Sequence, residues 1–559
     1  MNSVQVLDRP EFAAASRSGW LRVLLPLLIL NTLLTFGNDW PGLGVRFDLL
    51  LSVELCLGAS VLLLWVGRRG QPSAQVLSAL SAVFVMLVIA RYVEVTVPAV
   101  FGRPLNLYWD GRHAWQVLRM AAGELAPWRL AGGGLLLAGA AVLLFLLVRR
   151  MFGMLARGFG TCAGHRWMLA TGFGAVLLHM AQPWLAKDVR AAFSTPVSAG
   201  IVSSGGQLRT ALSPRSAERL GESPVFSGGV EALRGSDVLL IFAEAYGAVT
   251  FDDPEIAAAL ADSRAALAHA AQKSGRGVVS ARVRSPTFGG GSWLAHAALL
   301  SGVDTRDPGD YELLLTTDRP TLVSHFARNG YRTVAWMPGL QRPWPEGSFY
   351  GFDRYGDADG IGYAGPAFGY WRIPDQASLA LLQAQELGVA PAAGGPERGM
   401  PDSRVPRFVV FPTVSSHAPF RPVAPYVSDW SRLLRDDAYT PAQLDEALNE
   451  PVSWAEPLPG YLQSMRYTFE WLSGYLRAQA PPDLLTIVIG DHQPVAGVSG
   501  RDASWEVPVH VFSADPALLA RFEAAGFSAG LRGDVPLLGD MHELTGVLVD
   551  VFAVRNQAR

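Results

Sequence analysis

The stretch Leu484–His492, with the sequence LLTIVIGDH, is an apolar run that ends at a glycine and then places an aspartate beside a histidine. Continuous apolar runs are typical of strands that are buried on both faces, as in a parallel sheet. In open α/β sheets, ligands bind beyond the carboxyl ends of the strands. Asp491 and His492 are therefore candidate site residues. A single Asp-His pair is often only structural, so its partners decide the interpretation.

Further apolar runs have the same character, and patterns typical of helices separate them. The runs are Asp237–Ala245, Arg332–Gly339, Arg407–His417 and Val507–Pro516, and the helical patterns are Pro254–Ser274, Thr321–Asn329 and Tyr461–Ala478. Strands that alternate with helices predict an α/β domain whose largely parallel sheet is covered by helices on both faces. We assign this domain to residues 236–559.

The preceding part of the chain is more apolar. The chain has 559 residues, of which 50% are hydrophobic, and its mean hydropathy of +0.22 indicates a membrane part joined to an aqueous domain. Five stretches are each close to the roughly 20 residues that span a bilayer as a helix. They are Trp20–Phe36, Leu49–Val66, Val76–Val100, Leu130–Val148 and Trp167–Trp184. These stretches predict an α-helical five-span transmembrane domain over residues 1–186, followed by a linker at residues 187–235.

Arginines predict the orientation of this domain in the membrane. The clusters that flank the apolar stretches are Arg9, Arg17 and Arg22, then Arg68 and Arg69, then Arg149, Arg150, Arg157 and Arg166. All of them fall on one side if the N-terminus is cytoplasmic. The sequence therefore predicts a multi-pass protein of the bacterial inner (cell) membrane, with residues 236–559 on the periplasmic or extracellular side.

Cysteine content and net charge limit the other possibilities. Cys56 and Cys162 are the two cysteines, and both precede the α/β domain. That domain must therefore be stabilised by its core alone, without disulfides. The net charge of -3 predicts no nucleic-acid partner.

Ionisable residues that lie within the apolar stretches include Glu54, Arg91, Glu94 and His179. Charged groups inside a membrane are costly, so they usually pair with one another or serve a site. In the predicted topology all four lie toward the outer leaflet. They either pair to lock the helices together or bind a lipid headgroup, and the sequence leaves both alternatives open.

Several strand ends deliver groups that suit a metal. The run Asp237–Ala245 brings Glu244, the run Arg407–His417 brings His417, and Leu484–His492 brings Asp491 and His492. Parallel strands place these residues at one edge of the sheet. Two carboxylates and an imidazole suit Mn²⁺, Zn²⁺ or Mg²⁺, with room left for substrate. We expect one divalent ion held by Glu244, Asp491 and His492, with Mn²⁺ as the first choice.

Ser292 is the candidate nucleophile. It follows the glycines Gly289–Gly291 and opens an alanine- and leucine-rich helical pattern. A glycine loop lets the backbone approach a phosphate, and a helix N-terminus favours negative charge. A cation and that helix together favour the serine alkoxide. The alternatives are that Ser292 is only an N-cap, since serine is a favoured cap, and that Thr287 is the nucleophile.

These motifs resemble the alkaline phosphatase and sulfatase superfamily. The segment Ser292–Gly302, SWLAHAALLSG, is similar to the sulfatase nucleophile stretch, and the IGDHQ segment at Ile489–Gln493 is similar to the Gly-Asp-His metal motif of the superfamily. Membrane spans followed by an outward catalytic domain resemble the plan of lipoteichoic acid synthases and related phosphoglycerol transferases. The resemblance implies a mixed, mostly parallel sheet and makes Ser292 a fourth metal ligand.

Departures from the sulfatase pattern favour the phosphoglycerol transferase branch. The FAEAYG segment at Phe242–Gly247 is similar to the Glu-Ser-Phe of lipoteichoic acid synthases, and the residues after Ser292 lack the sulfatase formylglycine signal. His296 stands where sulfatases carry an arginine. The resemblance further implies that His417 contacts the substrate phosphoryl group and that Trp344 binds substrate. Glu346 stands at the position of a family arginine, with Arg342 nearby. By this resemblance we expect Trp344, Arg342 and Glu346 to bind the substrate headgroup together with His296.

The function that follows is a metal-dependent phosphotransferase. It is expected to move a phosphoglycerol-type headgroup from a phospholipid donor to a glycan or lipid acceptor through a covalent phospho-serine intermediate. One alternative is a phosphoethanolamine transferase, although that group usually carries disulfides in its exported domain. Another is a sulfatase-like phosphodiesterase that uses water as acceptor. A third is a membrane sensor with a retired catalytic domain, which the joint presence of Glu244, Ser292, Asp491 and His492 argues against.

Overall fold

The computed structural model describes residues 14–39, 42–106, 110–112, 127–161, 165–181, 192–213, 217–388 and 405–554. The chain divides into two compact units. The first comprises Met1–Ala99 and Pro104–Leu212, and the second comprises Val100–Arg103 and Ser213–Arg559. The division after Leu212 falls inside the linker predicted for residues 187–235.

The first unit is helical, and within the described residues each predicted apolar stretch overlaps a helix. Its elements are α1 (Ala14–Thr35), α2 (Val53–Arg69), α3 (Ala74–Phe101, whose last two residues group with the second unit), α5 (Pro127–Thr161), α6 (His165–Met180) and α8 (Val197–Leu212), with a small hairpin of β1 (Gly37–Asp39) and β2 (Gly44–Arg46). Within the described residues, two helices are long and apolar enough to cross a membrane: α3 and the Trp128–Gly160 part of α5. The apolar parts of α1 and α6 are shorter. Two such helices are weak evidence for a membrane domain, so the five-span arrangement stays a prediction.

The ionisable residues of the first unit make contacts within that unit. The Arg91 guanidinium lies 3.7 Å from the Glu94 carboxylate and donates to a backbone carbonyl at the end of α1 at 3.0 Å. Glu54 accepts hydrogen bonds from the backbone and the hydroxyl of a serine at the start of α8, each at 3.1 Å. The His179 ring packs against Phe193, with centroids 5.4 Å apart. The pairing alternative thus describes Arg91 and Glu94, and the other two contact different groups.

The second unit is built on a mixed sheet of nine strands. Their order is β10 (Ser528–Ala529), β4 (Gly277–Arg284), β9 (Glu506–Ser513), β8 (Leu485–Gly490), β3 (Val238–Ala243), β7 (Arg407–Pro412), β5 (Arg332–Trp336) and β6 (Arg354–Gly356), with β11 (Leu537–Asp540) paired to β4. β9 is antiparallel to both β8 and β4, and β10 is antiparallel to β4. The remaining pairs are parallel. The predicted mixed, mostly parallel sheet is therefore confirmed.

Helices follow and cover the strands. They are α9 (Val249–Asp252), α10 (Pro254–Ala259), α11 (Ala261–Lys273), α12 (Ser292–Ser301), α13 (Pro308–Leu314), α14 (Leu322–Arg328), α15 (Asp375–Leu382), α16 (Pro441–Asn449), α17 (Leu458–Ala478), α18 (Ala496–Ser499), α19 (Pro516–Ala524) and α20 (Leu544–Phe552). Short 3-10 turns are η2 (Ala217–Leu220), η3 (Glu231–Leu233), η4 (Pro345–Phe349) and η6 (Trp430–Leu434), and η5 (Gln383–Leu387) is a π-helical turn. The predicted helix Pro254–Ser274 is divided into α10 and α11 at Leu260.

Asp-Pro pairs start three of these helices. Asp253, Asp307 and Asp515 are the N-caps of α10, α13 and α19, and in each case the next residue is a proline. The aspartate side chain accepts backbone N–H groups that lack a helical partner, and proline at the first helical position loses no hydrogen bond there. The Asp-Pro pairs therefore define the first residues of α10, α13 and α19.

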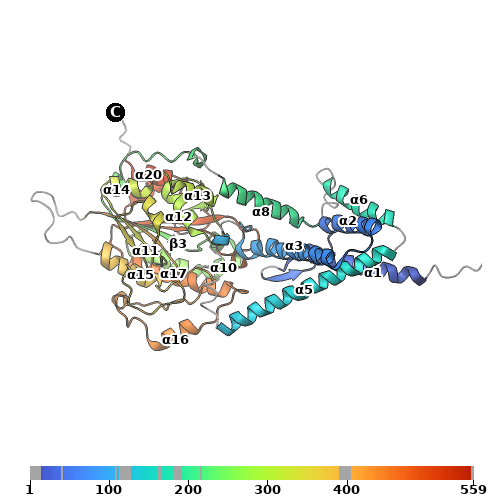
Figure 1. Cartoon of the computed structure of the whole chain (residues 1–559). Coiled ribbons are helices and arrows are strands. Elements are labelled where there is room, and N and C mark those ends of the chain that lie inside the picture. The colour runs from blue at the N-terminus through green and yellow to red at the C-terminus, as the bar shows by residue number, and fades with distance from the viewer. Residues whose placement is uncertain are drawn as a thin grey trace, which may run out of the picture. The chain divides into compact units, whose positions relative to one another are not determined.

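Alternation along β3 divides the core into two layers. Leu239 and Ile241 face one layer, and Leu240 and Phe242 face the other. Helices α11, α15 and α17 pack on the first layer, and α12, α14 and α20 pack on the second, on opposite sides of β3 in Figure 1. Both faces of β3 are buried, so neither face carries polar side chains, which explains the uninterrupted apolar sequence of the strand.

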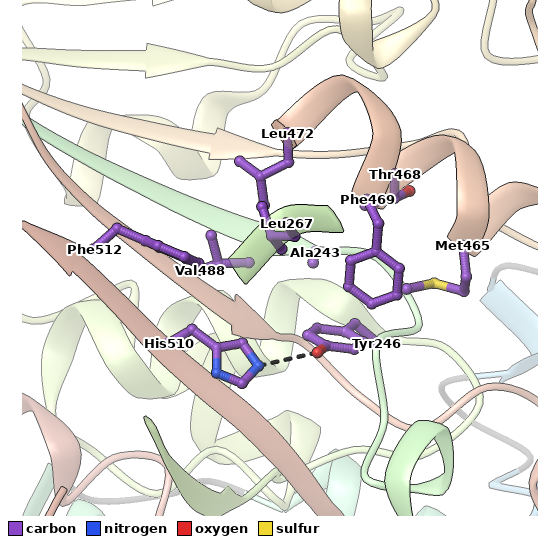
Figure 2. Close-up of a pocket in the computed structure, with 10 residues that line it drawn as sticks. All are labelled: Ala243, Tyr246, Leu267, Met465, Thr468, Phe469, Leu472, Val488, His510 and Phe512. Carbon is purple, nitrogen blue, oxygen red and sulfur yellow. Dashed lines mark hydrogen bonds between the residues drawn. The ribbon is translucent and has the colours of Figure 1, made fainter. Parts of the chain in front are cut away.

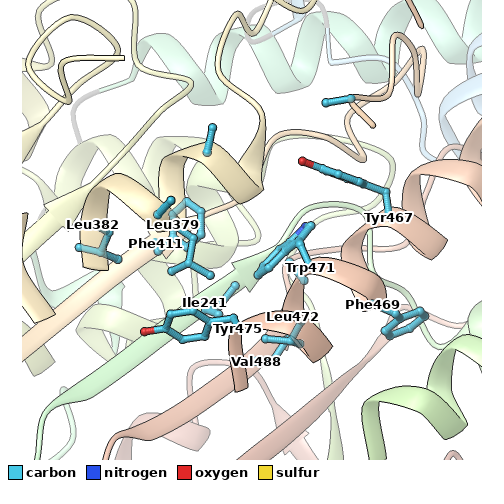
Figure 3. Packing of buried hydrophobic residues seen from close by; sticks show 14 of the residues in the cluster. Ile241, Leu379, Leu382, Phe411, Tyr467, Phe469, Trp471, Leu472, Tyr475 and Val488 are labelled. Atoms are coloured by element: carbon cyan, nitrogen blue, oxygen red, sulfur yellow. The ribbon is translucent and has the colours of Figure 1, made fainter. Parts of the chain in front are cut away.

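Aromatic residues of α17 fill the first layer. Tyr246 and Phe469 line a small hollow with Val488 (Figure 2). Farther along the same helix, Trp471 lies over Phe411, with ring centroids 6.5 Å apart (Figure 3). These side chains set the distance between α17 and the strands β3 and β8. Close packing carries that constraint to the ends of the two strands.

Phe326 of α14 offers a test of the second layer. Its ring is fully buried and stacks on Phe408 with centroids 4.0 Å apart. We expect Phe326→Ala to destabilise the protein by about 3–5 kcal/mol, because it removes apolar burial and leaves a cavity. Thermal unfolding of the full-length protein should show a much lower melting temperature than for Val225→Ala, a control at a 79% exposed position. Equal melting temperatures for the two variants would contradict this packing.

Candidate functional site

Strand register brings Glu244 and Asp491 together. In the parallel pair β3 and β8, Ala243 lies opposite Gly490, so the next residue of each strand is a carboxylate at the same sheet edge. The Ala245 amide donates to the Asp491 carboxylate at 2.8 Å. Both acids are buried, with 6% and 1% exposure for Glu244 and Asp491. Adjacent parallel strands thus create the pair of acids that the sequence predicted.

His492 faces the same point from the next position. Its Nδ1 lies 2.7 Å from the Gln493 carbonyl oxygen. A carbonyl can only accept, so Nδ1 carries the proton and Nε2 presents its lone pair. That Nε2 lies 3.5 Å from Glu244 and 3.7 Å from Asp491. The imidazole therefore has the tautomer and the orientation of a metal ligand.

Ser292 completes the cluster. Its Oγ lies 3.1 Å from the Glu244 carboxylate and 3.1 Å from Nε2 of His492. The N-cap of α12 is Gly291, and Ser292 is the first helical residue, so the interpretation of Ser292 as only an N-cap is wrong. The Thr287 hydroxyl donates to the Gly290 carbonyl, which leaves Ser292 as the hydroxyl that contacts the acids and the imidazole.

The buried acids fit a cation. Burial raises the pKa of the Glu244 carboxyl well above its ordinary value, and the charge of Asp491 raises it further. One ligand atom each from Glu244, Asp491 and His492 all lie within 4.8 Å of one another. Oxygen and nitrogen donors in this number, with a side left for substrate, suit a catalytic divalent ion. The residues present therefore fit the predicted metal, since a cation would relieve the mutual repulsion of the two acids.

His417 lies beyond the neighbouring strand β7. Its Nδ1 is 2.7 Å from the Ala418 carbonyl oxygen, so the proton sits on Nδ1 and Nε2 is an acceptor. Burial, together with nearby His492, lowers the pKa of His417 to about 4, although the Ala418 carbonyl and Asp491 act in the opposite direction. The ring packs against Trp371, with centroids 4.6 Å apart. His417 is thus a neutral imidazole near the cluster.

The residues assigned to substrate binding by resemblance lie in two places. The His296 ring packs on Phe242, with centroids 4.3 Å apart, and burial lowers its pKa to about 4. It lies one helical turn after Ser292. Trp344, by contrast, stacks on the ring of Tyr350 at 5.6 Å.

Arg342 and Glu346 flank Trp344 on the connection between β5 and β6, and both side chains are exposed. Among the described residues, no hydrogen bond or ion pair joins Arg342, Trp344 or Glu346 to the cluster at Ser292. A substrate role for the three residues stays a prediction.

Several supporting residues were not predicted from the sequence. Thr413 accepts the Glu244 amide at 2.9 Å, and the Ser416 hydroxyl donates to the Glu244 carbonyl at 2.6 Å. Asp375 at the start of α15 accepts the Val414 and Ser415 amides at 2.8 and 2.9 Å. Burial raises the pKa of Asp375 to about 6. These contacts hold the turn between β7 and His417, and no motif in the sequence indicated them.

The chain is similar to several solved structures at low sequence identity. No family model and no curated protein matches the chain. Among solved structures, the lipoteichoic acid synthase LtaP from Listeria monocytogenes is 12% identical with a TM-score of 0.32, covering 51% of this chain and 67% of that one. The C-terminal periplasmic domain of EcEptC from Escherichia coli is 11% identical with a TM-score of 0.36, covering 59% and 84%. The phosphoglycerol transferase GacH from Streptococcus pyogenes, solved with sn-glycerol-1-phosphate, is 12% identical with a TM-score of 0.29, covering 56% and 74%.

The cluster of Glu244, Asp491, His492 and Ser292 is formed by residues that are distant in sequence and meet at the carboxyl edge of β3 and β8. A metal ligand set and a hydroxyl in hydrogen-bond contact are the parts that a nucleophilic, metal-assisted reaction requires.

Metal binding can be measured directly. We expect the full-length protein to bind one Mn²⁺. Removal of a group that supports a metal ligand weakens metal affinity by roughly 10- to 100-fold. Glu244→Gln and Asp491→Asn change the ligands themselves, so we expect each variant to lose at least that much Mn²⁺ affinity. Isothermal titration of the metal-free protein with Mn²⁺ checks this. Asp502→Asn, an exposed acid of the loop after β8, is the control.

A second readout separates loss of a ligand from loss of structure. Because Glu244 and Asp491 repel each other without a cation, Glu244→Gln should leave the melting temperature of the metal-free protein unchanged or raise it. Unaltered Mn²⁺ affinity in both site variants would contradict the assignment of the metal ligands.

Proposed function

We propose that the chain is a membrane-anchored, metal-dependent phosphotransferase that moves a phosphoglycerol-type headgroup from a phospholipid to a glycan or lipid acceptor. The observation that supports this most directly is the position of the Ser292 hydroxyl, 3.1 Å from both Glu244 and His492. A serine in that position is a nucleophile held at a metal site. Transfer through a covalent phospho-serine ester is the reaction that such a group performs on a phosphodiester.

The nucleophile stands at the first residue of a helix. The start of α12 carries the positive end of the helix dipole, which favours a phosphoryl group beside Ser292. Glu244, Asp491 and His492 would hold a divalent cation, which when bound would supply Lewis acidity and favour the ionised form of the serine. We expect Mn²⁺, with Zn²⁺ or Mg²⁺ as alternatives, because two carboxylates and one imidazole suit all three.

The reaction then proceeds in two steps. In the first, Ser292 Oγ forms a bond to phosphorus while the bond from phosphorus to the diacylglycerol oxygen breaks, and the serine proton passes to that leaving alcohol. In the second, an acceptor hydroxyl attacks the phospho-serine ester, its proton returns to Ser292, and the bond between Oγ and phosphorus breaks. His417 is the candidate proton relay, because its neutral Nε2 is an acceptor while Nδ1 is held by the Ala418 carbonyl.

A membrane anchor suits a reaction on a lipid donor. The apolar helices α3 and α5 are long enough to span a bilayer, and the arginine distribution supports a periplasmic or extracellular position of the second unit. The donor lipid would then diffuse in the same leaflet as the anchor. Hydrolysis of a small solute needs no such anchor, which favours transfer over the phosphodiesterase alternative. The absence of cysteines beyond residue 186 in the sequence favours the phosphoglycerol branch over phosphoethanolamine transfer.

The covalent intermediate gives the sharpest test of the nucleophile. After incubation with phosphatidylglycerol labelled in its headgroup, we expect the label on the peptide that contains Gly289–Trp293, and we expect none in Ser292→Ala. Mass spectrometry of the digested protein locates it. Thr287→Ala is the control, since its hydroxyl is bound to the Gly290 carbonyl, and it should still be labelled. Label on any other peptide would remove Ser292 from this role.

Product analysis separates transfer from hydrolysis. With labelled phosphatidylglycerol and a glycan or lipid acceptor, we expect the headgroup to appear on the acceptor and diacylglycerol release to rise with acceptor concentration. Because the two steps are separate, initial rates should follow a ping-pong pattern. Free headgroup phosphate at the same rate with and without acceptor would instead identify a hydrolase.

A further inference from the structure

A buried chain of hydrogen bonds runs from the sheet edge to the turn that carries Glu244. Ser280 of β4 lies opposite His510 of β9 in the antiparallel register. The Ser280 hydroxyl lies 2.7 Å from the Gly530 carbonyl oxygen and 2.7 Å from Nδ1 of His510. Nε2 of the same imidazole lies 3.0 Å from the hydroxyl of Tyr246, as the dashed line in Figure 2 marks.

The direction of each hydrogen bond follows from the end of the chain. The Gly530 carbonyl can only accept, so the Ser280 hydroxyl donates to it and accepts the proton on Nδ1 of His510. The imidazole is neutral, since burial lowers the pKa of His510 to about 3, and its Nε2 therefore accepts from Tyr246. Three side chains and one carbonyl thus form a single ordered relay.

The surroundings make this relay costly to break. Tyr246 and His510 border a hollow that is otherwise lined largely by apolar side chains, including Phe469 and Met465 (Figure 2). All three side chains of the relay are buried, with exposures of 1% for Tyr246, 1% for His510 and 0% for Ser280. A buried polar group that loses its partner in such a place keeps the cost of desolvation. The hydrogen bond to His510 therefore restrains the Tyr246 ring to one position.

The backbone of Tyr246 connects the relay to both predicted metal-binding acids. Tyr246 follows Glu244 by two residues, and the intervening Ala245 has a positive φ of 53°. On the other side, the Tyr246 carbonyl lies so close to Gly490 that a Cβ at that glycine would meet it at 1.9 Å. Gly490 directly precedes Asp491. The backbone of Tyr246 thus lies against the ends of both strands that present the two carboxylates.

We propose that Tyr246 and His510 are positioning residues for the metal site. Their hydrogen bond fixes the turn after β3, and that turn sets the separation of Glu244 and Asp491. The inference rests on the proposed metal-dependent function. Neither side chain touches the metal or the substrate, so the effect on catalysis passes through the geometry of the two acids.

A matched pair of tyrosine variants tests this role. Tyr246→Phe removes the hydroxyl that donates to His510, and Tyr475→Phe removes an equally buried hydroxyl that donates to Gln383 at 2.9 Å, away from the site. Both should lower the melting temperature of the full-length protein by similar amounts. We expect Tyr246→Phe alone to weaken Mn²⁺ binding by roughly 10- to 100-fold, the usual effect of removing a group that supports a metal ligand.

Isothermal titration with Mn²⁺ measures the affinities, and labelled phosphatidylglycerol turnover at saturating Mn²⁺ gives the second readout. Added Mn²⁺ should restore most of the activity of Tyr246→Phe, which a variant that simply unfolds would not show. A wild-type affinity in Tyr246→Phe, or an equal loss in Tyr475→Phe, would overturn the positioning role alone. Absence of binding of Mn²⁺, Zn²⁺ and Mg²⁺ alike by the unaltered protein would overturn the proposed function and this inference together.

A double variant checks that the two residues act as one unit. His510→Leu breaks the same hydrogen bond from the other end, so Tyr246→Phe added to it should cause little further loss of Mn²⁺ affinity. Losses that multiply in the double variant would show that the residues act independently, which contradicts a shared relay.

Discussion

Two carboxylates that are buried side by side impose the main constraint on this molecule. Glu244 and Asp491 lie at the ends of paired parallel strands, with 6% and 1% exposure. Each charge opposes the other, and burial removes most of the water that would otherwise screen them. A fold gains nothing in stability from such a pair, so its presence points to a cation that both acids bind. The surrounding contacts can be understood as the means of holding the two acids close together.

The backbone around the acids is held from three directions. From β7, Thr413 and Ser416 bind the amide and the carbonyl of Glu244. From α17, the Tyr461 hydroxyl donates to the Ala245 carbonyl at 2.9 Å. From β9, His510 holds the Tyr246 ring. Because each contact comes from a different element, the packing of the two core layers against the sheet determines the geometry of the site.

Sequence patterns predicted the central strands and the cluster because both depend on local rules. Apolar runs identify strands buried on both faces, and parallel register then brings Glu244 and Asp491 together. β4 was not predicted, since its sequence GVVSARVR mixes serine and arginines with apolar residues. Those polar residues are explained only by tertiary partners: Ser280 binds His510, and Arg282 pairs with Asp252 at 2.6 Å. Asp375 was missed for the same reason, because nothing in a Pro-Asp pair reveals the two amides it accepts.

The three glycines before Ser292 determine how its hydroxyl is used at the start of α12. The hydroxyl of a serine at the N-cap accepts a hydrogen bond from one of the first backbone amides of the helix. Here Gly289, Gly290 and Gly291 have φ values of 65°, 137° and 82°, which side chains rarely adopt. The left-handed Gly291 takes the N-cap position without a side chain. Ser292 is therefore moved one residue into the helix, where its hydroxyl contacts Glu244 and His492.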